Sequence, residues 1–87
     1  MIIEAYIDHK KIRVGDEFKI KLNNINDKWY IFYIECNDDG SVNHAVLVNQ
    51  WLGNSIIVTE SNLFEDFKPT GENVKDIYNL AKKLLER

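Results

Sequence analysis

The chain has 87 residues, of which 45% are hydrophobic and 29% charged, and its formal net charge is −3. This length supports one hydrophobic core and excludes a second domain, while the apolar content excludes a disordered tail. The single cysteine, Cys36, excludes an internal disulfide and a zinc site built on paired cysteines, and it favours a cytoplasmic location. No export signal is visible, and no segment approaches the roughly 20 apolar residues of a membrane span, so we expect no membrane association.

Charge is unevenly distributed along the chain. Residues 29–67 carry six acidic and no basic side chains, whereas residues 1–28 and 68–87 each carry a small positive excess. A surface without Lys or Arg is poorly suited to phosphate groups and better suited to a basic partner. The plainer interpretation is that much of this segment is buried strand.

The N-terminal part of the chain predicts strands. Residues 2–7 form the first candidate, and a polar turn that contains His9 follows it. Residues 17–22 alternate between charged and apolar side chains, which predicts a strand with Phe18 on the core face and Glu17 on the solvent face.

A β-hairpin is the strongest prediction for the middle of the chain. Residues 29–36 are almost wholly apolar, which is typical of a central strand, and Asp39-Gly40 favours a two-residue type I′ turn. That turn sets a register with four cross-strand pairs: Cys36 with Asn43, Glu35 with His44, Tyr33 with Val46, and Ile31 with Val48.

The last third changes its periodicity at the only proline, Pro69. Before it, residues 55–59 predict a strand and residues 63–67 a short irregular or 3₁₀ segment. After it, residues 70–87 predict an amphipathic helix, because apolar side chains recur at helical spacing. These side chains are Val74, Ile77, Tyr78, Ala81, Leu84 and Leu85.

These elements predict a mainly β (α+β) fold. We expect a small five- to six-stranded barrel over residues 1–69 and a C-terminal amphipathic helix over residues 70–87, packed on the same domain. Three features resemble the SH3-like barrels: Val14-Gly15-Asp16-Glu17-Phe18-Lys19-Ile20, the aromatic strand that follows, and the passage from Val58-Thr59-Glu60 to Phe67-Lys68-Pro69. This resemblance spans residues 14–69 and extends broadly to small proteins of bacteriophages and prophages in low-GC bacteria. It implies a closed or nearly closed barrel but transfers no ligand-binding residue, because the ligand motif of eukaryotic SH3 domains is absent.

Catalytic and metal-binding patterns are weak. A catalytic thiol needs a base within hydrogen-bond reach, yet the predicted register turns Cys36 and His44 toward opposite faces of the hairpin. The segment Asp38-Asp39-Gly40-Ser41 lacks the alternating ligands of a calcium loop, and His9 and His44 do not form a metal motif. We therefore expect no enzymatic activity, no cofactor and no metal site.

The sequence favours a non-enzymatic protein-binding module with a basic protein partner. Its candidate surface combines acidic residues with aromatic anchors and His44. The candidate residues are Tyr30, Tyr33, Glu35, Asp38, Asp39, His44, Trp51, Glu60 and Asp66. The phage resemblance implies an effector that occupies a host protein.

Other interpretations stay open. The aromatic residues could belong to the core while the acids only keep the domain soluble. A basic strip could bind nucleic acid, although the isoelectric point of about 5.3 argues against it. The strip consists of Lys10, Lys11, Arg13, Lys19 and Lys21. A small-molecule site formed by oligomerisation, and a homodimer, are further alternatives.

Overall fold

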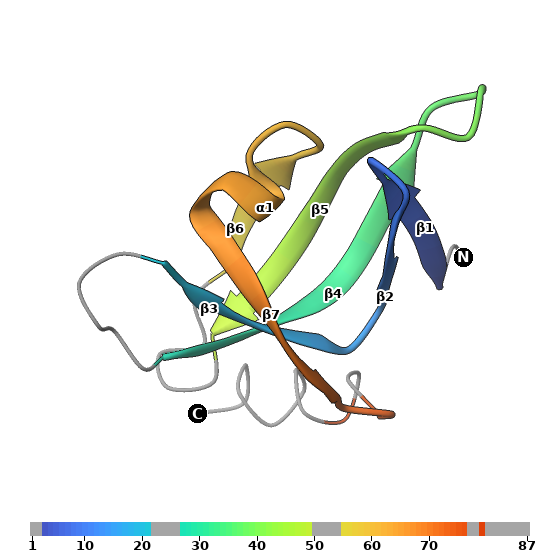
Figure 1. Cartoon of the computed structure of the whole chain (residues 1–87). Coiled ribbons are helices and arrows are strands. Elements are labelled where there is room, and N and C mark those ends of the chain that lie inside the picture. The colour runs from blue at the N-terminus through green and yellow to red at the C-terminus, as the bar shows by residue number, and fades with distance from the viewer. Residues whose placement is uncertain (1–2, 22–26, 50–54, 77–78, 80–87) are drawn as a thin grey trace.

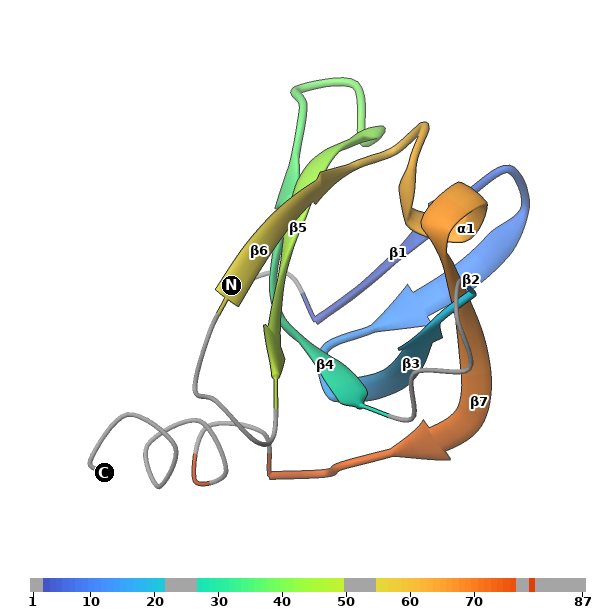
Figure 2. The same cartoon turned by 90° about the vertical axis from the view of Figure 1, so that its left-hand side faces the viewer.

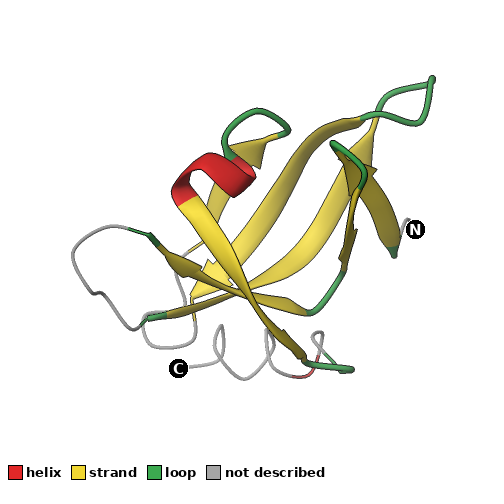
Figure 3. Cartoon of the chain, in the orientation of Figure 1, coloured by secondary structure: helices red, strands yellow, loops and turns green. Residues whose placement is uncertain are grey.

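The computed structural model describes residues 3–21, 27–49, 55–76 and 79, and this part of the chain is mainly β, as predicted (Figure 1). Strands dominate, and the helical segment between β6 and β7 is short (Figure 3). The elements are β1 (Glu4–Ile7), β2 (Lys10–Arg13), β3 (Asp16–Ile20), β4 (Lys28–Cys36), β5 (Val42–Asn49), β6 (Ser55–Thr59), α1 (Leu63–Asp66) and β7 (Phe67–Asn73). No helix in the described residues has the length and apolar character needed to cross a membrane.

The strands form two antiparallel sheets. Five of them lie in the order β6-β5-β4-β3-β7, and β1 pairs with β2 in a separate hairpin. The larger sheet is strongly curved, with β4, β5 and β6 on one side of the core and β3 and β7 on the other (Figure 2). The closed barrel expected from the sequence is absent from the described residues, because β6 and β7 remain edges and a turn with α1, rather than a strand ladder, connects them.

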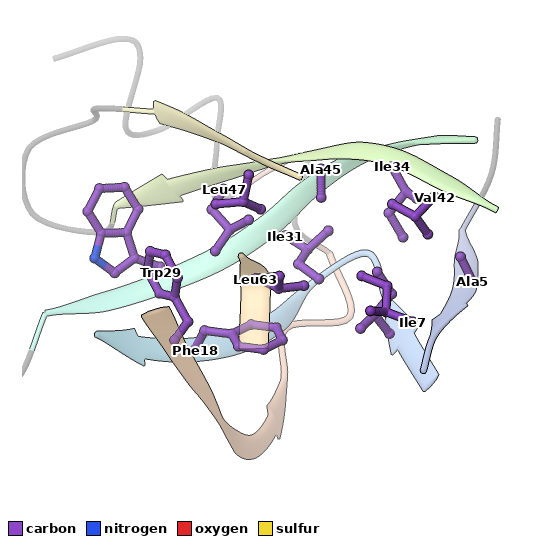
Figure 4. Packing of buried hydrophobic residues seen from close by; sticks show 13 residues of the cluster. Ala5, Ile7, Phe18, Trp29, Ile31, Ile34, Val42, Ala45, Leu47 and Leu63 are labelled. Atoms are coloured by element: carbon purple, nitrogen blue, oxygen red, sulfur yellow. The ribbon is translucent and has the colours of Figure 1, made fainter. Parts of the chain in front are cut away.

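The hydrophobic core lies on the concave side of the curved sheet (Figure 4). The β1-β2 hairpin adds Ile7 and Ile12, and α1 adds Leu63, all three at most 1% exposed. Two edge-to-face aromatic pairs contribute as well, Phe18 with Phe64 and Trp29 with Phe67. Residues from both sheets and from α1 thus share one core.

The β1-β2 hairpin turns through Asp8 and His9, which have φ angles of 49° and 67°. Ile7 pairs with Lys10, so the loop has two residues, and two consecutive positive φ angles are the requirement of a type I′ turn. Asp and His tolerate this backbone region better than most residues but less well than glycine. The sequence predicts a polar turn here without indicating its type.

The β4-β5 hairpin differs from its prediction in the turn and in part of the register. Only Gly40 has a positive φ there, and its N–H donates to the Asn37 carbonyl, so Asp38, Asp39 and Gly40 form a three-residue loop instead of a type I′ turn. The predicted pairs of Glu35 with His44 and of Tyr33 with Val46 are confirmed. Two β-bulges shift the remaining predictions, so Cys36 lies opposite Val42 and Ile31 opposite Leu47.

Strand β7 occupies residues where the sequence predicts the start of a helix. Pro69 pairs with Phe18, which is tolerated because β7 is an edge strand and Pro69 needs no N–H for a further neighbour. The register shifts by two residues before Asn73 meets Asp16, and Gly71 has a φ of 90° in this bulge. The helix predicted over residues 70–87 therefore does not begin at 70, and residues 77–78 and 80–87 lie outside the described part.

Candidate functional site

Three neighbouring strands present a row of apolar side chains on the convex face of the sheet. Tyr33 on β4 lies opposite Val46 on β5, and Val46 lies opposite Ile57 on β6. Tyr33 is 39% exposed and Ile57 is 70% exposed, while Val46 is half-buried. Large apolar side chains side by side on an exposed sheet face indicate a binding surface more strongly than isolated ones do.

The next row of the same face is polar, and it consists of Glu35, His44 and Thr59 on the same three strands. The Tyr33 hydroxyl donates a hydrogen bond to Oε2 of Glu35, and this bond together with the negative charge of Glu35 raises the pKa of Tyr33. Nδ1 of His44 lies 2.7 Å from Oδ1 of Asn43. We call Tyr33, Glu35, His44, Val46 and Ile57 the outer patch.

Glu35 and His44 do not form an ion pair in the structure. The two residues face each other in the predicted register, but each side chain hydrogen-bonds a different neighbour. Among the described residues, the salt bridges connect Glu4 with Lys11 and Arg13 instead. A carboxylate and an imidazole therefore lie side by side on the patch while each bonds another side chain.

The tip of the β4-β5 hairpin carries two more predicted residues, Asp38 and Asp39, both exposed. The Ser41 hydroxyl and backbone N–H donate to Oδ1 of Asp39 at 2.6 and 2.9 Å, and these bonds lower the pKa of Asp39. Asp39 thus has a structural role in shaping the turn while it keeps its negative charge.

A cleft of about 400 Å³ opens where this hairpin meets the β1-β2 turn and the end of β6. Among the lining residues that the structure describes, Asp8 and Glu60 are carboxylates and none is basic. The other lining residues are Asn37, Val42, Asn43, Thr59 and Ser61. Glu60 is a predicted site residue, whereas Asp8 is not, because only the folded chain brings the two turns together.

The cleft does not have the composition of a metal centre. In the part of the chain that the structure describes, no three His, Cys, Asp or Glu side chains gather closely enough to hold a metal ion. Cys36 packs against the core, and His44 binds Asn43, so the two do not form a nucleophile and base pair.

Tyr30 differs from the other predicted site residues that the structure describes, because it is only 6% exposed. Its hydroxyl donates to Oε2 of Glu17 at 3.1 Å, and the Thr70 hydroxyl donates to Oε1 of the same carboxylate at 2.8 Å. Burial first, and then the charge and hydrogen bond of Glu17, raise the pKa of Tyr30 to about 12. Tyr30 is therefore part of a buried polar network.

The burial of Glu17 contradicts the predicted strand pattern. Glu17 is 7% exposed, although the alternation of residues 17–22 predicts that it lies on the solvent face. Tyr30 covers it from β4, and the bulge in β7 turns Thr70 toward it. A carboxylate is stable in this position because two hydroxyl groups replace the water that it loses.

The two predicted site residues not yet described are Asp66 and Trp51. Asp66 lies on α1, which packs on β7, and its carbonyl accepts a hydrogen bond from the Lys21 N–H. Trp51 lies outside the described residues.

Comparisons of the chain with protein-family models, with curated proteins and with solved structures find no match. Function must therefore be argued from the site alone.

Proposed function

We propose that this chain is a non-enzymatic protein-binding module and that the outer patch holds a basic protein partner. The observation that carries the proposal is the exposed apolar row of Tyr33, Val46 and Ile57 beside the carboxylate of Glu35. Interfaces commonly combine an apolar centre with a charged rim, and the sign of the rim selects the partner. Residues 29–67, which contain the patch, carry no Lys or Arg.

Nucleic-acid binding through the basic strip is the weaker candidate. Nζ of Lys11 lies 3.2 Å and Nε of Arg13 lies 3.5 Å from Oε2 of Glu4, so one carboxylate already compensates two cations. Nζ of Lys10 lies 4.6 Å from the centre of the Phe64 ring in a cation–π contact. A phosphate backbone would have to compete with these interactions for each cation.

The same proposal includes an SH3-like arrangement of the strands and the role of a phage-type effector in the cytoplasm. The strong curvature of the five-stranded sheet and the single helical turn between β6 and β7 support the SH3-like part. The effector role rests on resemblance in sequence and on the binding character of the patch.

A titration with a synthetic peptide tests the proposal. The probe is a peptide of about eight residues that alternates Lys and Val, which is long enough for an extended segment to cross a sheet face. We expect backbone amide NMR signals of Tyr33, Val46 and Ile57 to shift on addition of this peptide, and the affinity to fall as salt is added.

Two controls make the titration decisive. A peptide that alternates Glu and Val should bind much more weakly. Ile57→Ser should weaken binding of the Lys peptide, whereas Ile3→Ser, which changes a similarly exposed side chain (64%) outside the patch, should not. Absent shifts, equal binding of both peptides, or equal effects of the two substitutions would refute the proposal.

A further inference from the structure

The two edges of the five-stranded sheet are built differently. Strand β7 carries Pro69, a bulge at its centre and charged side chains such as Lys68, which are devices that protect an edge against pairing with another chain. Strand β6 has the sequence Ser-Ile-Ile-Val-Thr, without a charge, a proline or a register shift. An edge of this kind is a template for a further strand.

The backbone hydrogen bonds of Thr59 show which groups point away from β5. Its N–H donates to Oδ1 of Asn62, and its carbonyl accepts from the Asn62 N–H, so both groups face the open edge. Successive residues of an antiparallel strand alternate between the inner and the outer side of the ladder. The backbone groups of Ile57 and Ser55 therefore face the same edge as those of Thr59.

Asn62 also limits how far an added strand can extend. It occupies the outward groups of Thr59, which leaves those of Ser55 and Ile57 for an incoming chain. In the part of the chain that the structure describes, β6 pairs with β5 alone. An incoming strand would thus pair at two residues and then pass beside the turn at Glu60 and Ser61, which line the acidic cleft.

We propose that the partner binds as an extended segment that adds a strand to the β6 edge, with an apolar side chain beside Ile57 and a Lys or Arg side chain at the cleft of Asp8 and Glu60. This inference rests on the proposed protein-binding function and specifies how the partner binds. The apolar side chain extends the row of Tyr33, Val46 and Ile57 by one strand. The basic side chain complements two carboxylates in a cleft whose described lining residues include no cation.

Amide hydrogen exchange with the Lys-Val peptide tests the added strand. We expect the amides of Ser55 and Ile57 to become at least about tenfold more protected when the peptide binds, because both would donate to the new strand. Binding without this protection would overturn the strand addition and leave the proposed function intact. Absence of binding would overturn both.

A matched pair of substitutions at one position isolates the backbone. Ser55→Pro removes an outward N–H at the first residue of an edge strand, where proline is tolerated. It should weaken peptide binding about three- to tenfold, the effect expected for one hydrogen bond, while Ser55→Ala should leave binding unchanged. Equal affinities of the two variants, with circular dichroism that matches the parent, would refute the inference.

A second pair tests the cleft. Glu60→Gln should weaken binding of the Lys peptide and reduce its salt dependence, whereas Asp38→Asn, an exposed acid outside the cleft, should have a smaller effect. The reverse ranking would contradict the cleft as the cation site.

Protection of Ser55 and Ile57 that rises with protein concentration, in the absence of peptide, would show that a second copy occupies the edge and would overturn the proposed occupant.

Discussion

Tyr30 and Tyr33 lie on the same strand and the same face of the sheet, and each donates its hydroxyl proton to a glutamate, yet their surroundings are opposite. Tyr30 is 6% exposed and binds Glu17, which Thr70 also contacts, whereas Tyr33 is 39% exposed and binds Glu35 at the surface. One hydrogen-bonded pair stabilises the fold, and the other forms part of the candidate interface.

The comparison shows that residue type alone does not separate structural from binding groups. A hydrogen bond between exposed groups contributes little net free energy because water competes for both partners, whereas loss of one partner from a buried pair leaves a desolvated polar group behind. Along β4, the convex face of the sheet thus has a buried end around Tyr30 and an exposed end around Tyr33. Four experiments test this division.

Gly15→Ala should have the largest effect, because Gly15 anchors the segment that covers the buried end. Its N–H donates to the Ile31 carbonyl, and its carbonyl accepts from the Val74 N–H. At a φ of 94°, an added Cβ would lie 2.3 Å from the Val74 carbonyl oxygen. We expect a loss of about 3 kcal/mol or more in the free energy of unfolding, measured by urea denaturation.

Gly40→Ala is the matched control for this loss. Gly40 has a similar φ of 89°, but no atom lies within 4 Å of an added Cβ. This variant should lose only about 1 kcal/mol, the cost of the left-handed backbone. Equal losses would mean that steric contact with Val74 is not what makes Gly15 necessary.

Replacement of the two glutamates compares the two ends directly. Glu17→Ala should lower the free energy of unfolding by about 2 to 4 kcal/mol, because it removes the carboxylate that accepts from the buried Tyr30 hydroxyl and from the half-buried Thr70 hydroxyl. Glu35→Ala should change it by less than about 0.5 kcal/mol, as is usual at the surface. Similar losses in chemical denaturation would remove the distinction between the ends.

The raised pKa of Tyr30 predicts how stability depends on pH. Below pH 10 Tyr30 is protonated in both states, but between its ordinary pKa of 10.0 and about 12 the unfolded chain loses the proton while the folded chain retains it. Folded protein then binds more protons than unfolded protein, so stability must fall as the pH rises through this range. Urea denaturation across the range should show a smaller fall for Tyr30→Phe than for Tyr33→Phe.

His9→Gly should have the smallest effect and should increase stability. His9 has a φ of 67° in the turn beside the cleft, and glycine adopts this backbone without steric cost. We expect a gain of about 0.5 to 1 kcal/mol in the free energy of unfolding, seen as a higher melting temperature in calorimetry. A loss instead would show that the imidazole itself stabilises the β1-β2 turn.

The sequence allowed prediction of those features that depend on local pattern. The apolar hairpin, the pairs Glu35 with His44 and Tyr33 with Val46, the strand at residues 55–59 and a core that contains Phe18 all follow from alternation and turn chemistry.

Features that depend on contacts between distant segments were not predictable. Glu17 is buried because Thr70, far away in the sequence, reaches it from a bulge, and Pro69 lies in a strand because β3 offers it a partner. Asp8 and Glu60 share a cleft for the same reason. Local propensity carries no information about such contacts, because tertiary packing overrides it.

The bulge at Phe32 has a consequence for sequence change in β4. Side chains alternate along a regular strand, so two tyrosines three residues apart would face opposite sides, and so would Ile31 and Ile34. The extra residue between Ile31 and Tyr33 lets both tyrosines share one face while both isoleucines enter the core. A one-residue deletion in a strand normally turns every side chain beyond it to the other face of the sheet. Deletion of Phe32 would instead leave every side chain of β4 on its present face, because Phe32 is the extra residue of the bulge. Strand β4 therefore contains a position where its length can change in evolution without loss of the core.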